Sequence, residues 1–574
     1  MNSRTNVIIL AFGVIFLLMV YKLYVLQIRG HEDFAILADR QYISNSNTLL
    51  HRGTIYFSDK SGVRIPAATL SENYKVAFNP MHLDKNRERV FSVINTLVKL
   101  DRGEFFAKAN KQNDPYEELS VSLTKEQADI LSSYKIGGLQ IIRERRRFYP
   151  GGELAAQTLG FVGYNKNNKE GIYGLEKYFN DKLDKDSSSA LVNPFSQLFS
   201  DVKSVIDAKN MLSSDVETTI EPTVSRMLQK ELMTVKEKWG ADEAGGIVID
   251  PNTGEILALD SVPSFDPNNF SNVPNASVYS NPLVEHVFEM GSIIKPIMMS
   301  IAFNEGVVTP TTTYDDKGFV NVRDRTIRNF DRLGRGPGTT MERVLIESLN
   351  TGMYFATSKV PKQKMRDYLH EFGLYDKTNV ELPYEASSIM KNLDKNNDVA
   401  FANASFGQGI ALSPMVTVKA LSVIANGGYV VNPTLIKKTD LDNVIPLQSR
   451  VVKKETTEEM TKILTKIVSQ SLVKYVEPPK GYDIAAKTGT AQIPDPRTGG
   501  YMTDRNLHSF FGYFPAEEPR FLIFMYLKRP ANVKFSAQTL SLPFMNMVKF
   551  LISYYSIPPK VVEEAEQASK KQTP

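Results

Sequence analysis

Cysteine is absent from the 574 residues, and tryptophan and histidine are scarce, with 1 and 6 copies. The lack of cysteine excludes disulfides, thiol catalysis and cysteine-ligated metals, and it fits an oxidising compartment without proving one. The histidines form no ligand-like pair along the chain: His31, His51, His82, His286, His370 and His508. We therefore expect neither a metal site nor a cofactor.

The chain also has no large excess of positive or negative charge. Lys and Arg number 68 against 64 Asp and Glu, which leaves a net charge of +4 and an isoelectric point near 8.7. No basic stripe is interleaved with aromatics, which argues against a dedicated nucleic-acid partner. With 42% hydrophobic and 23% charged residues the composition is that of a globular protein. The length predicts two or three domains.

The sequence contains one long hydrophobic run, which lies near its start. Val7 to Val20 is continuously apolar, and the run continues past Lys22 to Leu26. Roughly 20 such residues suffice to cross a bilayer if the Lys22 amine reaches the surface. Arg4 precedes the run and no small-x-small cleavage site follows it. We expect a cytoplasmic segment over residues 1–6 and an uncleaved transmembrane signal anchor over 7–28, with a cleaved signal peptide as the alternative.

Residues 30–215 alternate short strand-like runs with polar loops. Tyr74–Phe78 alternates like a strand, Val90–Leu100 is amphipathic, and Thr124–Ser133 is a helix in which Thr124 and Gln127 suit a capping box. No residue type here suggests reaction chemistry. We interpret this region as a β-rich pedestal, elongated and devoted to packing, docking or dimerisation.

Residues 216–556 carry the pattern of an α+β domain. Gly246–Asp250 and Glu255–Leu259 predict a hairpin. Further strands are expected at Asp483–Ile493, His508–Phe514 and Arg520–Leu527. Helices are expected at Thr223–Trp239, Pro414–Asn426 and Ser541–Tyr555. We also expect a turn at Gly334–Gly338 and a polar loop over Pro494–Asn506. The prediction is an antiparallel sheet flanked by helices. Residues 557–574 are charged, and we expect them to be disordered.

The strongest chemical signal is the segment Phe288–Pro296, which opens an apolar helix. Residues three apart on a helix share a face, so the Lys295 amine can reach the Ser292 hydroxyl. Free backbone N–H groups at a helix start suit a developing oxyanion. Burial lowers the pKa of a lysine toward a useful base. Ser292 is the candidate nucleophile and Lys295 the candidate general base.

Ser-x-x-Lys alone is a weak signal, since the spacing recurs at Ser122/Lys125, Ser132/Lys135, Ser200/Lys203, Ser388/Lys391 and Ser471/Lys474. Two companions strengthen it. Ser348-Leu349-Asn350 follows a helical pattern at 341–347, and Lys487-Thr488-Gly489-Thr490 lies within the predicted strand 483–493. This ordered triple is the signature of penicillin-binding proteins and serine β-lactamases.

Nearly the whole chain resembles the class B penicillin-binding proteins, which are monofunctional peptidoglycan D,D-transpeptidases. The motifs that carry the resemblance are Arg52-Gly53-x-Ile55, Arg147–Pro150, Gly171–Glu176, Phe288–Ser292, Lys487–Thr490 and Phe511–Pro515. Met290 departs from the usual proline, and Leu349 replaces a commoner small residue. The short loop before the serine and the absence of C-terminal repeat modules look more like the septal branch than the elongation branch.

The resemblance implies roles for the remaining site residues. Ser348 and Lys487 would pass a proton to the leaving amine, and Asn350 would hold the substrate amide. Strand alternation alone points Lys487 away from the site, so its role rests on the resemblance. The same resemblance implies an oxyanion hole formed by the backbone N–H groups of Ser292 and Thr490.

The Lys-Thr-Gly strand suggests how a substrate carboxylate is held. Thr488 and Thr490 share a strand face and are expected to bind it, while Gly489 leaves room for the substrate. Each residue also has a simpler structural alternative. Asn350 could cap a helix, the two threonines could be ordinary strand residues, and Gly489 could form a bulge.

The resemblance implies partners and a location as well. Stem peptides ending in D-Ala-D-Ala are the expected substrates, β-lactams the expected inhibitors, and a membrane glycosyltransferase of the SEDS family, with other division proteins, the expected partner. The protein would lie in the bacterial inner membrane, single-pass, with an extracytoplasmic catalytic domain at the septum. Alternatives are an elongation-type transpeptidase, a D,D-carboxypeptidase, a β-lactamase, which needs no anchor or pedestal, and a non-catalytic division scaffold.

Overall fold

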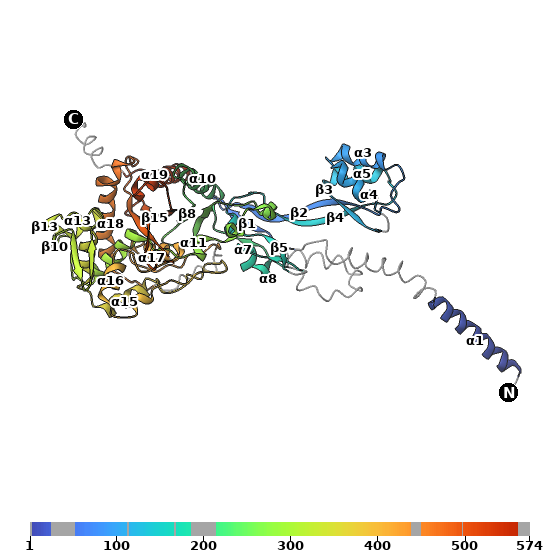
Figure 1. Cartoon of the computed structure of the whole chain (residues 1–574), viewed down its shortest axis with the longest axis horizontal. Helices are drawn as coiled ribbons and strands as arrows, with labels where there is room; N and C mark the ends of the chain where they lie inside the picture. Colours follow the sequence, from blue (N-terminus) through green and yellow to red (C-terminus); the bar gives the residue numbers. More distant parts are fainter. Residues whose placement is uncertain are drawn as a thin grey trace, which may run out of the picture. The chain divides into compact units, whose positions relative to one another are not determined.

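The computed structural model describes residues 3–24, 52–111, 114–165, 168–184, 214–437, 449–495 and 497–560 (Figure 1). Helix α1 spans Ser3–Tyr24. Within these ranges no helix combines the length and the apolar character needed to cross a bilayer. The end of the predicted anchor (25–28) and most of the tail predicted to be disordered (561–574) lie outside the described residues.

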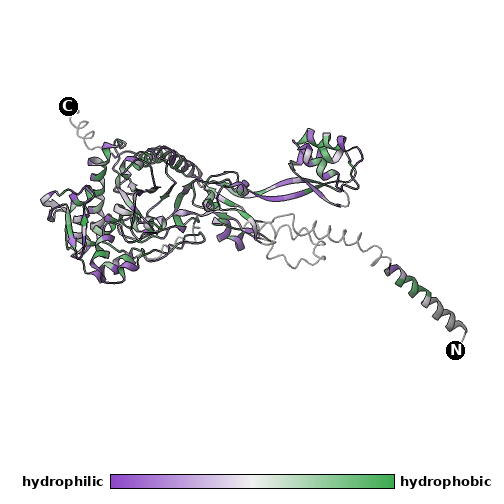
Figure 2. Ribbon diagram, in the orientation of Figure 1, coloured by the Kyte–Doolittle hydropathy of each residue, from purple (hydrophilic) through white to green (hydrophobic). Residues whose placement is uncertain are grey.

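The chain divides into two compact units, the first of which includes residues 70–148. Its strands β3 (Glu117–Leu123) and β4 (Leu139–Phe148) both pair with β2 (Arg64–Phe78). Helices α3 (Arg87–Leu97), α4 (Arg102–Ala109) and α5 (Lys125–Ser133) enclose a core around Phe78, Phe105 and Leu131. The predicted capping box of Thr124 and Gln127 is confirmed. Figure 2 colours β2 and β4 as mainly hydrophilic.

The second unit joins residues 53–69 to the chain from 149 onward. It begins with β1 (Ile55–Ser58), which pairs with β2 and with β7 (Val216–Glu217). Short elements follow Tyr149: α6 (Ala156–Leu159), β5 (Val162–Asn165), β6 (Asn168–Gly171), α7 (Gly174–Tyr178) and α8 (Asn180–Leu183).

The motif residues in this part have a structural role. The Tyr149 hydroxyl donates to the buried Glu176 carboxylate at 3.3 Å, and the backbone N–H of Ala155 donates to buried Asp260 at 3.2 Å. Ser225 Oγ donates to the same Asp260 carboxylate at 2.7 Å. Burial raises the pKa of Asp260 to about 7. The contact between Ala155 and Asp260 joins this segment to the strand that contains Asp260.

A five-stranded sheet with the order β14–β15–β16–β8–β9 forms the centre of the second unit. The strands are β8 (Glu243–Ile249), β9 (Ile256–Val262), β14 (Ala485–Pro494), β15 (Tyr501–Phe514) and β16 (Phe521–Lys528). Every neighbouring pair is antiparallel, so the prediction of an antiparallel sheet is confirmed. β14 is an edge strand, which leaves one side of its backbone unpaired within the sheet.

Helices cover the sheet on both faces. One group consists of two helices that contact each other and the sheet, α10 (Pro222–Lys238) and α19 (Ser536–Tyr554). Three other helices also contact the sheet: α11 (Pro282–Glu285), α17 (Pro414–Ala425) and α18 (Lys454–Gln470). α12 (Lys295–Asn304) is buried from Lys295 to Ala302, as its apolar sequence predicts. Near it lie α13 (Met341–Ile346), α14 (Asn350–Thr357), α15 (Lys362–Glu371) and α16 (Asp398–Ala404).

Several predicted boundaries are wrong, and three examples lie in the second unit. The Gly334–Gly338 turn already contains the start of β13 (Gly336–Thr340), which pairs with β10 (Thr313–Asp316). The predicted loop 494–506 is half strand, because β15 begins at Tyr501 and pairs back to Pro494. α19 starts at Ser536, and Pro543 lies inside it. Between β10 and β13 the chain forms a small hairpin of β11 (Phe319–Val322) and β12 (Arg325–Arg328).

Candidate active site

Ser292 lies on a single 3₁₀ turn, Gly291–Ile294, that leads directly into α12. Gly291 has a φ of +63°, and a Cβ there would lie 2.9 Å from the Thr490 carbonyl oxygen. The serine turn therefore packs closely on β14, and only glycine combines this backbone conformation with this approach. The predicted placement of Ser292 at a helix start is confirmed, with one tighter turn before the α-helix.

Gly489 also allows the serine turn to pack closely on β14. It is buried, and a Cβ there would lie 2.3 Å from Ser509 Oγ and 2.7 Å from the Met290 carbonyl oxygen. Ser509 Oγ itself donates to that carbonyl at 2.8 Å. The space beside Gly489 is thus filled by the segment that precedes Ser292, whereas the sequence suggested room for substrate.

Lys295 is fully buried, and its amine lies among groups of the Ser-x-Asn segment. Its Nζ donates to the Ser348 carbonyl at 2.6 Å and to Asn350 Oδ1 at 2.8 Å, and it lies 3.2 Å from Ser348 Oγ. Burial lowers its pKa well below the usual lysine value, and the neighbouring charge of Lys487 lowers it further. A buried amine with a depressed pKa can accept a proton from a hydroxyl.

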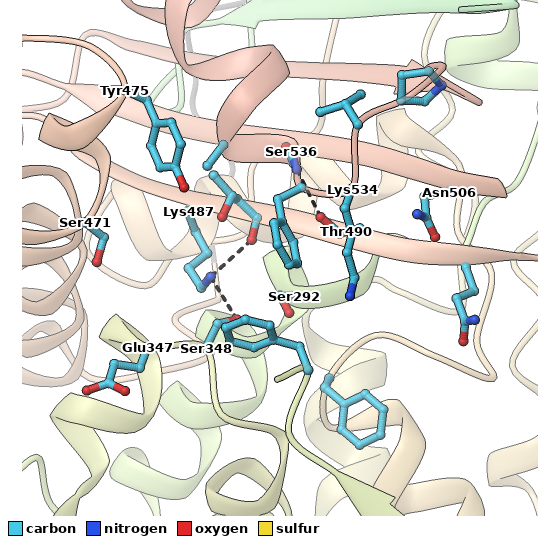
Figure 3. Close-up of a pocket in the computed structure, with 18 of the residues that line it drawn as sticks. Ser292, Glu347, Ser348, Ser471, Tyr475, Lys487, Thr490, Asn506, Lys534 and Ser536 are labelled. Carbon is cyan, nitrogen blue, oxygen red and sulfur yellow. Dashed lines mark hydrogen bonds between the residues drawn. The ribbon is translucent and has the colours of Figure 1, made fainter. Parts of the chain in front are cut away.

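Ser348 connects the two lysines. Its Oγ lies 3.2 Å from Lys295 Nζ. The same Oγ accepts from Lys487 Nζ at 3.1 Å (Figure 3). Its φ of +57° is a left-handed conformation that costs a non-glycine residue about 1–3 kcal/mol. This strain places the hydroxyl between the amines in the break between α13 and α14.

Lys487 alternates with the two threonines along β14, yet its amine reaches the site. Its Nζ donates to the Thr488 carbonyl at 3.1 Å as well as to Ser348. The long side chain of an edge-strand residue can bend its amine around the strand, which strand alternation alone does not show. Burial lowers the pKa of Lys487 to about 7.

A buried carboxylate that the sequence did not single out holds the Ser-x-Asn segment. Asp316 accepts from Thr351 Oγ1 at 2.8 Å, from Asn329 Nδ2 at 3.0 Å, and from the backbone N–H groups of Gly318 and Arg335. Asn329 Oδ1 in turn accepts from the backbone N–H of Thr351 at 3.2 Å. The β10–β13 segment thereby fixes the residue that follows Asn350.

Replacing this carboxylate tests its importance. Asp316→Ala leaves several buried donors without an acceptor, so we expect it to lower the free energy of unfolding by about 2–4 kcal/mol. Displacement of Asn350 should also slow acylation by penicillin, by up to about 10²-fold. Denaturant unfolding and stopped-flow labelling measure the two effects. The control is Asp315→Ala, which removes an exposed carboxylate next to it; equal effects of both variants would contradict the role of Asp316.

The two threonines face a different set of groups. Thr488 and Thr490 are half-buried, and Thr490 Oγ1 accepts from the backbone N–H of Ser536 at 3.1 Å (Figure 3). With its oxygen engaged in this way, the Thr490 hydroxyl hydrogen can be donated to an anion. Opposite Thr490 on β15 lies buried His508, which contacts Thr539 Oγ1 at 2.9 Å and the Lys534 carbonyl at 3.2 Å. Burial lowers the pKa of His508 to about 4, which keeps its ring neutral at pH 7.

Most of the predicted site residues line one groove with a volume of about 1350 Å³. Of the predicted site residues, Ser292, Ser348, Asn350, Lys487, Thr488 and Thr490 line it, while Lys295 and Gly489 lie beneath the surface. Ser471 and Lys474, a second Ser-x-x-Lys pair, line the same groove, but Lys474 is exposed. Within the described ranges, no cluster of His, Asp and Glu is arranged to hold a metal ion.

Two buried lysine amines with lowered pKa values contact the Ser348 hydroxyl, beside the edge strand of an antiparallel sheet and in the groove that Ser292 lines. This arrangement fits the class of active-serine acyltransferases. Residues 244–547 match the penicillin binding protein transpeptidase domain, and residues 49–193 match the penicillin-binding protein dimerisation domain. The chain belongs to the penicillin-binding protein transpeptidase family.

Curated relatives align over most of the chain. Stage V sporulation protein D of Bacillus subtilis is 27% identical over 94% of this chain and 84% of its own length. Peptidoglycan D,D-transpeptidase FtsI of Escherichia coli is 26% identical, over 77% of this chain and 75% of its own. Penicillin binding protein 2X from Streptococcus thermophilus has a similar fold, with a TM-score of 0.71 and 20% identity over 88% of this chain and 80% of its own.

Proposed function

We propose that this protein is a peptidoglycan D,D-transpeptidase that forms an acyl-enzyme on Ser292. The observation that carries the proposal is the continuous contact from Lys295 through Ser348 to Lys487, which links the helix of Ser292 to the edge strand β14. The names of the aligned relatives support it, since several are peptidoglycan D,D-transpeptidases.

Acylation begins at the carbonyl between the two terminal D-alanines. Ser292 Oγ attacks this carbon while the neutral Lys295 amine takes the hydroxyl proton. The backbone N–H groups of Ser292 and Thr490 receive the negative oxygen, and one such donor is worth about 10²–10³ in rate. The C–N bond then breaks, and the departing D-alanine nitrogen gains a proton from Lys295 through Ser348 and Lys487.

Binding groups on both walls position the donor peptide. The Thr488 and Thr490 hydroxyls donate to its terminal carboxylate, with the positive charge of Lys487 nearby. The amide of Asn350 holds the peptide backbone. An amine of a second stem peptide then attacks the acyl-serine ester, restores the Ser292 hydroxyl and leaves a cross-link. A β-lactam acylates the same serine and blocks this second step.

Septal cell-wall synthesis is the cellular role that we assign, on the similarity to FtsI and to a sporulation protein. The apolar run at residues 7–28 supports an inner-membrane anchor with the catalytic unit outside the cytoplasm. The pedestal region supports docking to a SEDS-family glycosyltransferase and other division proteins. Membrane fractionation of the chain with and without residues 1–28 tests the anchor: an unchanged distribution would contradict it.

The acceptor distinguishes a transpeptidase from a carboxypeptidase. Purified full chain incubated with a D-Ala-D-Ala stem pentapeptide and an amine-bearing acceptor stem should release one D-alanine for each cross-linked dimer. Mass spectrometry of the products measures both, and pretreatment with a penicillin should suppress them together. Release of D-alanine with only the hydrolysed tetrapeptide, and no dimer, would show a D,D-carboxypeptidase.

A further inference from the structure

The active-site groove carries more positive charge than the whole chain. Its lining contains eight basic side chains and two acidic ones, a balance of +6 when all are charged, against +4 for the 574 residues. Both acids are already neutralised: Asp242 pairs with Arg529 at 2.7 Å, and Glu347 pairs with Arg335 at 2.7 Å and with Arg343. The groove therefore presents an excess of cations to any substrate.

Five of these cations form a set that we call the basic rim. Each is exposed, and none makes an ion pair with an acid among the residues that the structure describes: Arg328, Arg332, Lys474, Arg505 and Lys534. Two of them lie over aromatic rings, Arg328 over Phe319 at 5.6 Å and Lys534 over Phe535 at 5.3 Å. Like charges on the lining of one groove repel one another, and a bound anion reduces that repulsion.

Two members of the basic rim are fixed next to the groups that bind the donor peptide. The carbonyl of Arg328 accepts from Asn350 Nδ2 at 2.9 Å. The backbone carbonyl of Lys534 contacts the ring of His508. Two residues further on, the backbone N–H of Ser536 donates to Thr490 Oγ1. Figure 3 shows its side chain extending into the pocket.

Arg505 extends this arrangement along the sheet. Its neighbour Asn506 pairs with Gln492, two residues beyond Thr490 on β14. A peptide whose terminal carboxylate lies at Thr488 and Thr490, and whose preceding amide lies at Asn350, would continue along the groove that Arg328, Arg505 and Lys534 also line. These three cations are therefore placed for an anionic group upstream of the scissile bond.

We propose that the basic rim is a second anion-recognition site, which selects donor peptides that bear a free carboxylate upstream of D-Ala-D-Ala over peptides in which that group is amidated. Guanidinium groups suit a carboxylate because they can bind it with two hydrogen bonds. The summed field of the rim also speeds the encounter with an anionic peptide. This inference rests on the proposed transpeptidase function of the same site.

The test compares two synthetic pentapeptide donors that differ only in one upstream carboxylate or carboxamide. With full chain in detergent, we expect kcat/KM for D-alanine release to favour the carboxylate form about 5–20-fold at low ionic strength, since each exposed pair contributes modestly. About 1 M salt should bring the ratio close to one. The variant R328Q/R505Q/K534Q should also bring it close to one, while K549Q, which removes an exposed cation of α19 outside the groove, should leave it unchanged.

Equal rates for the two donors in the wild type would overturn the proposal, as would an undiminished preference in the triple variant. Inhibition by millimolar pyrophosphate, without discrimination between the donors, would assign the rim to phosphate and overturn the carboxylate assignment. Labelling of each protein by a fluorescent penicillin separates these failures from failure of the proposed function. Wild-type protein that forms a Ser292 adduct but shows no preference refutes only the rim, whereas a folded wild type without an adduct refutes the transpeptidase.

Discussion

Ser292→Ala is expected to abolish the covalent adduct with fluorescent penicillin, and to reduce D-alanine release by on the order of 10⁶-fold, as loss of the nucleophile does in other serine acyl enzymes. The reason is chemical: the alanine has no oxygen to form the ester, and the groove retains only its binding groups. Gel fluorescence of the labelled protein and mass-mapping of the digested adduct measure the result. The adduct should be found on the peptide that contains Ser292 and on no other.

The groove itself contains a matched control. Ser471 and Lys474 repeat the Ser-x-x-Lys spacing within the same lining, so a reagent that reaches Ser292 can also approach Ser471. Ser471 ends α18 rather than starting a buried helix, and Lys474 is exposed, whereas Lys295 is fully buried. Ser471→Ala should therefore retain the full adduct. An adduct that survives Ser292→Ala but disappears in Ser471→Ala would reassign the nucleophile.

This comparison shows what the sequence determines about the site. Six copies of one spacing occur in the chain, and their order relative to Ser348, Asn350 and Lys487 excludes only the copies at Ser388 and Ser471. The apolar helix that follows Ser292 separates it from the three earlier copies. The other two motifs also lie next to strong local signals, which are a helix break and a β-branched strand. The structure brings all three motifs to one groove, as the triple predicts.

What the sequence did not show depends on contacts between distant segments. Asp316 reaches Thr351 across 35 positions, and no local pattern marks an acid at the end of a short strand as a support for that segment. His508 looked like one scattered histidine, and it acquires its position only through β14–β15 pairing and the start of α19. The basic rim was equally invisible, since its members are distributed from Arg328 to Lys534 in a chain of nearly balanced charge.

The second large effect concerns the pH dependence of acylation. Lys295 acts as a base only when neutral, so the acylation rate should rise with pH through its lowered pKa and then level off. Lys487 keeps its charge below its pKa of about 7, and in the proposed mechanism that charge would help to bind the substrate carboxylate. As pH rises through about 7, Lys487 loses its proton, and kcat/KM should decline. The profile of kcat/KM is therefore expected to be bell-shaped, with limbs that belong to the coupled lysines.

Removing one lysine should move the limb of the other. Lys487→Gln deletes a positive charge that lowers the pKa of Lys295, so the acid limb should shift to higher pH and the alkaline limb should disappear. The plateau should fall by about 10²–10⁴-fold, because the proton relay through Ser348 is lost. Stopped-flow acylation at a series of pH values measures both changes.

Lys419→Gln is the matched control for this experiment. Lys419 is another buried lysine whose pKa burial lowers, but it lies on α17 outside the groove lining. Its loss should leave both limbs where they are in the wild type. If the acid limb of Lys487→Gln stays in place while the plateau falls, then Lys487 acts on the leaving group alone and does not tune Lys295. If the limb moves equally in Lys419→Gln, the shift reflects a general loss of structure, and the charge coupling between Lys295 and Lys487 is refuted.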